Sequence, residues 1–382
     1  MNTNETKKML KYAMVGGGPG AFIGDVHRTA IRIDNKAMLV GGVFSADSAK
    51  SKAFGIELGL DEKRLYDSAL QMATEEGQRE DGIDFVVIVT PNVFHYSDAK
   101  AFLENGIHVV SDKPLTVEVE QSRSLVALAQ EKGLLFGVTY TYTGYPVVKQ
   151  IAHMIQSKAI GEVRFVNAEY PQQWLVAAGD VSQIWWAKPE FSGKANCLGD
   201  IGTHVENMVA TMTGLSIKRL CARLDSFVEN HQLDDNVSVM VEYEGGAKGL
   251  YWTSQIAIGY DNALKVRIFG TQGTIEWSQE EPDQFSLVTL SGPKQIYVRG
   301  RDTFAPVAQS YSRLPGGHPE GVYEAFANIY KAFTSSLLEV KNGVPFDQVT
   351  GGYPTVEEGL RGIEFVDACL RSSQNDMTWV DL

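Results

Sequence analysis

The fold of this chain is decided by residues 10–24, which read LKYAMVGGGPGAFIG. The apolar run from Leu10 to Val15 predicts a short buried strand, and the glycine-rich turn that follows leads into a helical pattern that reaches Ile33. A strand, a glycine turn and a helix in this order are typical of dinucleotide-binding domains, in which backbone N–H groups and the helix N-terminus receive a pyrophosphate. The stretch therefore predicts a nucleotide-binding domain at the start of the chain.

Glycine is needed in this turn because a Cβ atom would hold the phosphates away from the backbone. Gly16 and Gly18 match the first two positions of the G-x-G-x-x-G pattern, whereas the third glycine comes late, at Gly24. We expect Gly16, Gly18 and Gly20 to contact the cofactor. A plain glycine-rich turn is the alternative, and the strand and helix patterns on either side of it disfavour that interpretation.

Alternating strand and helix patterns continue to about residue 140. Residues 85–89, FVVIV, are continuously apolar, which predicts a strand buried on both faces of a parallel sheet. Repeated βα units specify a doubly wound parallel sheet of the Rossmann type, whose ligands lie beyond the carboxyl ends of the strands. The polar residues that follow the strands at this edge are the predicted cofactor contacts: Thr90, Asn92, His95, Asp112 and Lys113.

The end of the second predicted strand bears on the choice of dinucleotide. An Asp or Glu at this position usually binds the adenosine ribose of NAD. Here residues 43–47 read VFSAD, so Ser45 occupies the place of the acid, and Lys50 is near enough to meet a 2′-phosphate. We predict NAD as the cofactor, with a contact at Ser45, and NADP stays open as the alternative.

Residues 140–146, YTYTGYP, form an aromatic turn that we take as a domain boundary. It divides a dinucleotide-binding domain, residues 1–140, from a substrate-binding and oligomerisation domain, residues 141–382. After Gly214 strand patterns dominate, and valines alternate with other residues in 236–243, which indicates a sheet with one covered and one open face. We predict an α/β domain with a large, open, mostly antiparallel sheet. Because an open sheet commonly finds a partner, we expect a homodimer or homotetramer.

Residues 198–204, LGDIGTH, are the strongest candidate for chemistry. Asp200 and His204 are four residues apart, so on a helix their side chains share one face. A carboxylate beside an imidazole is a general base with its orienting partner. The alternative is an N-capping Asp followed by a half-buried structural His.

Oxidation of an alcohol by a nicotinamide needs a base for the hydroxyl proton and a carbon held against the cofactor. His204 suits the base, because its ordinary pKa is near the working pH. Lys113 can stabilise the developing alkoxide. Tyr142, Trp186 and His318 complete the expected substrate contacts, with core packing as the alternative for Trp186 and a solvated or capping role for His318. No cluster of His, Cys and carboxylates predicts a metal.

Composition limits the partners and the compartment. The formal charge of −13 over 382 residues argues against nucleic acid and anionic membrane surfaces as partners. No apolar run approaches the length of a membrane span, and the polar residues 1–8 lack the apolar core of a signal peptide. Three scattered cysteines, Cys197, Cys221 and Cys369, predict a reducing cytoplasm without a disulfide framework. We expect Cys197 to be a small packed residue.

With these residues in place, the chain resembles the Gfo/Idh/MocA family, which includes glucose–fructose oxidoreductase and inositol dehydrogenases. The resemblance covers nearly the whole length and rests on five motifs: the glycine turn with His27, Thr90-Pro91-Asn92 with His95, Asp112-Lys113-Pro114, Gly199-Asp200-Ile201-Gly202-Thr203-His204, and Phe269-Gly270-Thr271-Gln272-Gly273-Thr274. It implies that Lys113 contacts the reacting hydroxyl and that Asp200 and His204 bind the substrate and move its proton. Three features depart from the family pattern: extra residues in the glycine turn, Asp112 in place of Glu, and Thr143 in place of Arg.

The leading prediction is an NAD(P)-dependent dehydrogenase that reversibly oxidises a secondary hydroxyl of a sugar, glycoside or inositol-like cyclitol to a ketone. Two alternatives remain. One is an enzyme that keeps NAD tightly bound for transient oxidation, as some related glycosidases and epimerases do. The other is a non-catalytic dinucleotide-sensing protein, a class that we expect to lose Lys113, Asp200 or His204.

Overall fold

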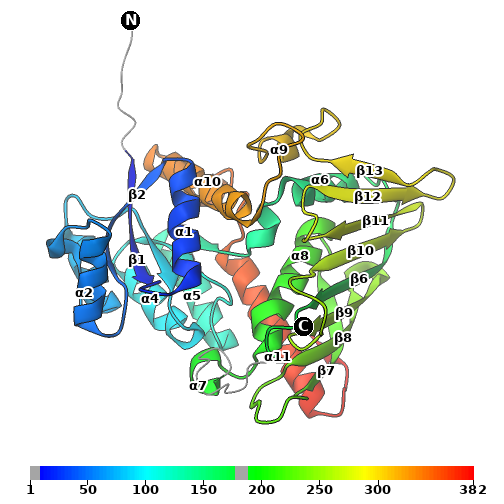
Figure 1. The fold of residues 1–382 in the computed structure, drawn as a ribbon, viewed down its shortest axis with the longest axis horizontal. Helices are drawn as coiled ribbons and strands as arrows, with labels where there is room; N and C mark the ends of the chain where they lie inside the picture. Colours follow the sequence, from blue (N-terminus) through cyan, green and yellow to red (C-terminus); the bar gives the residue numbers. More distant parts are fainter. Residues whose placement is uncertain (1–8, 177–187) are drawn as a thin grey trace, which may run out of the picture.

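The computed structural model describes residues 9–176 and 188–382, and their strands form two sheets that lie on opposite sides of the molecule (Figure 1). Several helices lie between the two sheets, among them α8 and α11. The predicted fold class is confirmed: one sheet is parallel and Rossmann-like, and the other is large and mostly antiparallel.

In the described part of the chain the first sheet has five strands in the order β2-β1-β3-β4-β5, all parallel. Its strands and their helices are β1 Leu10–Gly16, α1 Phe22–Ile33, β2 Ala37–Val43, α2 Ser48–Glu57, α3 Ala69–Gln78, β3 Phe85–Val89, α4 His95–Glu104, β4 His108–Ser111, α5 Val119–Lys132 and β5 Phe136–Val138. Every residue of β3 is buried, as its apolar run predicts. Strand β2 pairs with one side of β1, and β3 pairs with the other side, so the strand order reverses its direction between β1 and β3. In such sheets the ligand crevice lies beyond the carboxyl ends of the two strands at the reversal, here β1 and β3.

The second sheet has nine strands among the described residues, in the order β13-β12-β11-β10-β6-β9-β8-β7-β14. They are β6 Val163–Pro171, β7 Ile217–Asp225, β8 Asn236–Tyr243, β9 Lys248–Ser254, β10 Lys265–Gly270, β11 Gly273–Ser278, β12 Gln284–Thr289, β13 Gln295–Val298 and β14 Val380–Asp381. Of the pairs in this sheet, β6 with β9 is parallel and the rest are antiparallel.

Helices cover one face of this sheet. Apolar residues that point to this face alternate along the strands with residues that point to the open face, as predicted. In β8, Val237, Val239 and Val241 are buried, while Ser238 and Met240 between them are exposed. The covering helices are α6 Pro146–Gln156, α8 Thr203–Thr213 and α11 Val356–Gln374. Shorter helices α7 Pro189–Ser192 and α9 Pro306–Gln309 lie in the connections.

Helix α10, Val322–Lys341, packs on the first sheet although it belongs to the second half of the sequence. Figure 1 shows it beside α1. Its apolar residues, such as Phe326 and Phe333, enter the core that β1 and β3 form, and Gly137 of β5 bridges to Thr355. The first sheet ends with β5 at Val138 and the second begins with β6 at Val163, but the segment 322–341 from the second half of the sequence completes the core of the first sheet.

No helix in the described ranges is both long and apolar enough to cross a membrane.

Candidate active site

Most glycines of the turn pack too closely against their surroundings for any side chain. A Cβ on Gly18 would lie 2.2 Å from the carbonyl oxygen of Phe44, and one on Gly24 would lie 2.4 Å from the Cα of Gly17. The late glycine of the motif thus lets α1 approach the turn, which is the packing role of the third glycine in dinucleotide-binding folds. Gly20 has φ +77° and faces open space at the N-terminus of α1. This cradle fits a pyrophosphate.

His95 ties together the two loops at the carboxyl edge of the sheet. Its Nδ1 lies 2.8 Å from the carbonyl of Pro114 and its Nε2 lies 2.7 Å from the carbonyl of Thr90. The side chain is buried, and both ring nitrogens face carbonyl oxygens of the chain. His95 thus lies between the loops that carry Thr90 and Lys113, and its contact with the cofactor stays a prediction.

Lys113 and Asp200 form the centre of the site. The Lys113 ammonium donates to a carboxylate oxygen of Asp200 and also to its backbone carbonyl, the latter at 2.8 Å. Burial disfavours the ammonium, but the carboxylates of Asp200 and Asp112 offset this effect and hold the pKa of Lys113 above its usual value. Lys113 is thus a half-buried cation with two of its three N–H groups engaged.

Asp112 is held in place from two sides. Its Oδ1 accepts from the backbone N–H of Lys113 at 2.9 Å and from the Thr139 hydroxyl at 2.8 Å. Its other oxygen lies 4.0 Å from the buried ring of His27, which pairs with Tyr330 of α10 at 2.5 Å. Helix α10 therefore supports the edge where the cofactor is expected.

Asp200 lies in a π-helical turn, Leu198–Gly202, that continues into α8. The turn begins where it does because the buried carboxylate of Asp234 accepts from the backbone N–H groups of Asn196 and Leu198, both at 2.7 Å. Burial raises the pKa of Asp234 to about 6, against the opposing effect of these hydrogen bonds. Asp234 was missed in the sequence, because no motif and no helix or strand pattern marks this residue.

Gln255 fixes the second oxygen of the Asp200 carboxylate. Its Nε2 donates to Asp200 Oδ2 at 2.8 Å, and its Oε1 accepts from Asn196 at 2.8 Å. Both Asp200 oxygens are thus engaged, one by Lys113 and one by Gln255. Helical spacing predicts His204 as the partner of Asp200, whereas the structure gives the carboxylate Lys113 and Gln255 as partners; the catalytic grouping of Lys113, Asp200 and His204 stays a prediction.

His204 lies in a box of aromatic rings at the start of α8. The ring centroids of Tyr140, Tyr142 and Tyr170 lie 5.7, 4.9 and 6.3 Å from its own. Burial and the nearby Lys113 cation lower the pKa of His204 well below its usual value. The imidazole is therefore neutral at pH 7, which is the form that accepts a proton.

The other predicted residues make no contact with the Lys113–Asp200 pair that the structure describes. Asn92 and Ser45 are half-buried at the carboxyl edge of the sheet. His318 is exposed, and its loop is held by the Arg299 guanidinium, which donates to the His318 carbonyl. The structure does not join His318 to the Lys113 group. Trp186 lies outside the described residues. Cys197 is buried, as expected.

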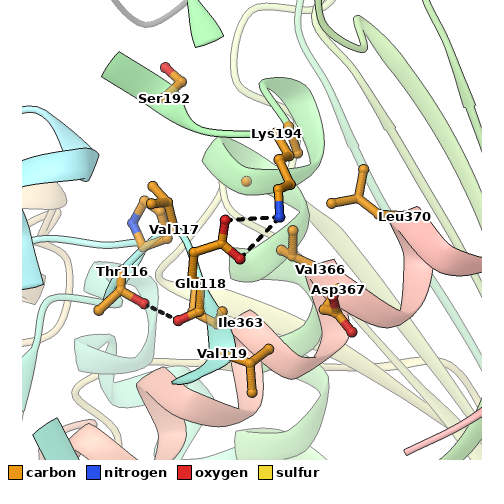
Figure 2. Close-up of a pocket in the computed structure, with 13 residues that line it drawn as sticks. Thr116, Val117, Glu118, Val119, Ser192, Lys194, Ile363, Val366, Asp367 and Leu370 are labelled. Atoms are coloured by element: carbon orange, nitrogen blue, oxygen red, sulfur yellow. Dashed lines mark hydrogen bonds and ion pairs between the residues drawn. The ribbon is translucent and has the colours of Figure 1, made fainter. Parts of the chain in front are cut away.

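A pocket behind the site does not contain the catalytic candidates (Figure 2). It lies between the loop after Lys113 and helix α11, bordered by Pro114 and Gly199. The Glu118 carboxylate crosses it to reach Lys194, with N–O distances of 2.8 and 3.0 Å. Among the described residues no group of three His, Cys, Asp or Glu side chains could hold a metal ion.

Comparisons with known proteins match both halves of the chain. Residues 10–140 match the family model described as oxidoreductase family, NAD-binding Rossmann fold, and residues 148–276 match the GFO/IDH/MocA C-terminal domain. An uncharacterized oxidoreductase of Bacillus subtilis, YfiI, is 36% identical over 98% of this chain and 97% of its own length.

Solved structures agree over the same length. An inositol dehydrogenase homolog of Azotobacter vinelandii, complexed with NADH and myo-inositol, is 34% identical with a TM-score of 0.92 and 98% of each chain covered. An oxidoreductase of Sinorhizobium meliloti is 42% identical with a TM-score of 0.88, covering 98% of this chain and all of its own.

Proposed function

Since this chain belongs to the Gfo/Idh/MocA family of NAD-binding oxidoreductases, we propose that it reversibly oxidises a secondary hydroxyl of a cyclitol or sugar to a ketone. The observation that carries the proposal is the meeting of Lys113 from the first sheet with Asp200 from the second domain, beside the box that holds His204. A related structure contains NADH and myo-inositol, which supports a polyol as the substrate class.

The residues present fit NAD. The turn with Gly16, Gly18 and Gly20 and the N-terminus of α1 would hold its pyrophosphate, and Thr90 and Asp112 stand at the edge where the nicotinamide half is expected. When bound, NAD⁺ supplies a hydride acceptor.

Lys113 binds the oxygen of the reacting hydroxyl. Two of its N–H groups go to Asp200, and the third is left for the substrate. As the alcohol becomes a ketone, negative charge develops on that oxygen, and a preorganised cation stabilises this charge. Asp200 keeps Lys113 charged and oriented, and Gln255 keeps Asp200 oriented.

His204 accepts the hydroxyl proton. Its imidazole is neutral because burial and the Lys113 cation both disfavour the imidazolium. The same cation that stabilises the alkoxide therefore keeps the base unprotonated until the substrate arrives. In the reverse direction the imidazolium returns the proton to the oxygen of the product alcohol.

The open face of the second sheet is proposed as the contact with a further copy of this chain. Phe165 and Phe269 lie on it with their rings 6.4 Å apart, and Leu250 is exposed beside them. Soluble proteins seldom leave such apolar clusters uncovered. The test is the molar mass in solution, which Phe269→Asp should reduce. The three free thiols are consistent with the expected cytoplasmic location.

The activity itself is tested with NAD⁺ and a panel of inositols, hexoses and anhydrosugars, followed at the NADH absorbance band. At least one polyol should reduce NAD⁺, and His204→Ala should lose about 10²–10⁴-fold in kcat while it still binds NAD⁺. His153→Ala, a change at an exposed histidine of α6, is the matched control and should keep wild-type rates. NAD⁺ binding with no polyol turnover would reject the proposed reaction.

A further inference from the structure

A chain of hydrogen bonds runs along the sheet from the edge of the site to Tyr142. Trp174 Nε1 donates to Gln172 Oε1 at 2.8 Å, and Gln172 Nε2 donates to Asn262 Oδ1 at 2.8 Å. The Tyr170 hydroxyl lies 2.5 Å from the same Asn262 oxygen and 2.5 Å from the Tyr142 hydroxyl. Asn262 Nδ2 closes a ring with a 3.3 Å bond to the Tyr142 oxygen.

The donor and the acceptor of every hydrogen bond in this series follow from Trp174. An indole N–H only donates, so the Gln172 atom that faces Trp174 is its carbonyl oxygen, and its amide nitrogen faces Asn262. The atom of Asn262 that receives this bond is therefore its carbonyl oxygen, which only accepts. The side-chain amides of Gln172 and Asn262 cannot be rotated without setting two donors against each other.

Tyr170 must then donate its proton to Asn262. Burial raises the pKa of Tyr170 well above its usual value, so its hydroxyl stays protonated and has one proton to give. Since that proton goes to Asn262, the bond between the two tyrosines uses the proton of Tyr142. The Tyr142 oxygen also receives the Asn262 amide, which leaves it with acceptor capacity alone.

We propose that Tyr142 is a specificity-determining residue that accepts a hydrogen bond from a free hydroxyl of the substrate, next to the hydroxyl that is oxidised. Tyr142 is half-buried, unlike Tyr170, and its ring centroid lies 4.9 Å from that of His204, so Tyr142 lies beside the proposed base. The substrate is thus a vicinal diol, in which an ether, a fluorine or a carbonyl cannot replace the second hydroxyl. This inference rests on the proposed polyol oxidation.

Neutron diffraction from crystals of the deuterated full chain reads the proton positions directly. We expect deuterium on the Tyr142 oxygen along the line to Tyr170, and deuterium on Tyr170 along the line to Asn262. A Tyr142 deuterium directed into the site would overturn the inference. Because this measurement needs no substrate, it is decided even if no polyol is oxidised, an outcome that would reject the proposed function separately.

The kinetic test compares myo-inositol with analogues in which fluorine replaces a hydroxyl beside the oxidised carbon. A fluorine cannot donate, so the wild-type kcat/KM should fall by about 10-fold to 100-fold, the range for one unmade hydrogen bond at an acceptor inside the site. In Tyr170→Phe the Tyr142 proton is released and can turn toward the fluorine. The ratio of kcat/KM for myo-inositol to kcat/KM for the fluorinated analogue should therefore be several-fold smaller than in the wild type. Intrinsic effects of fluorine on hydride loss are equal in all variants and cancel.

Tyr243→Phe is the matched control, because Tyr243 forms a buried tyrosine pair with Tyr251 at 2.6 Å on the same sheet. It should keep the wild-type discrimination. The proposal is overturned if Tyr170→Phe discriminates as strongly as the wild type, or if the wild type oxidises both compounds equally well.

Discussion

Replacing Lys113 by Met tests the two effects that the site combines. Methionine keeps the length and apolar stem of the side chain but removes the ammonium. The substrate oxygen loses its donor, and Asp200 loses its counter-ion while Gln255 still holds its carboxylate in place. A negative charge is then left beside the oxygen on which negative charge develops, so the damage should exceed the loss of one hydrogen bond.

The two losses have different sizes. Removing one donor to a developing oxyanion costs about 10²–10³ in kcat. A carboxylate about 5 Å from the alkoxide would add about 3 kcal/mol at an effective dielectric of about 20. Since 36% of the Asp200 side chain is exposed, solvent screens part of this repulsion, and about 1.4 kcal/mol, a factor of about ten, is a reasonable share. We expect Lys113→Met to lower kcat by about 10³–10⁴.

The double variant Lys113→Met/Asp200→Asn separates the two effects. It removes the stranded charge and should recover about tenfold of the lost kcat, even though Asp200 is itself part of the site. Initial rates on a working polyol and the dissociation constant of NAD⁺ should be measured for each variant. Lys149→Met, a change at a lysine of α6 whose pKa burial lowers to about 8, is the control and should stay near wild type. A double variant no faster than Lys113→Met would refute the charge argument.

Three further predictions concern the base and the cofactor. Because the pKa of His204 is depressed, the kcat of oxidation should stay level as pH falls to 6.5 and drop only below it; a midpoint above pH 6.5 contradicts this. Gly24→Ala puts a Cβ into the backbone of the turn and should weaken NAD⁺ binding about tenfold or more, whereas Gly321→Ala, whose Cβ meets no atom nearer than 3.7 Å, should not. Ser45→Asp should lower affinity for NADP⁺ by at least tenfold and leave NAD⁺ binding intact, as measured by thermal shift; equal losses for both would contradict the assigned ribose position.

The elements of the fold could be predicted where the signal is local. The apolar run of β3 and the alternating valines of β8 both follow from the faces that these strands bury, and each appears within a few neighbouring residues. The glycine turn is of the same kind, because its backbone geometry excludes side chains at positions close together in sequence. The late position of Gly24 makes sense once α1 is seen to pack against the turn.

The partners inside the site could not be predicted in the same way. Helical spacing predicted that Asp200 pairs with His204. In the structure the Asp200 carboxylate is hydrogen-bonded to Lys113, 87 residues earlier, and to Gln255, 55 residues later. No sequence motif marks Gln255 or Asn262, because the role of a side-chain amide depends on the atoms to which it is hydrogen-bonded in the folded protein. Such pairings depend on how the two sheets are placed.

The amino-acid sequence by itself determined the two sheets, the glycine turn and the residue types of the candidate active site, because each of these depends on local periodicity or on the chemistry of a single side chain. The tertiary structure decided which charges meet. It placed Asp200 against Lys113, His204 among aromatic rings that keep it neutral, and the Tyr142 hydroxyl against that of Tyr170, because a hydrogen bond or an ion pair forms only between atoms that folding brings within about 3 Å of each other.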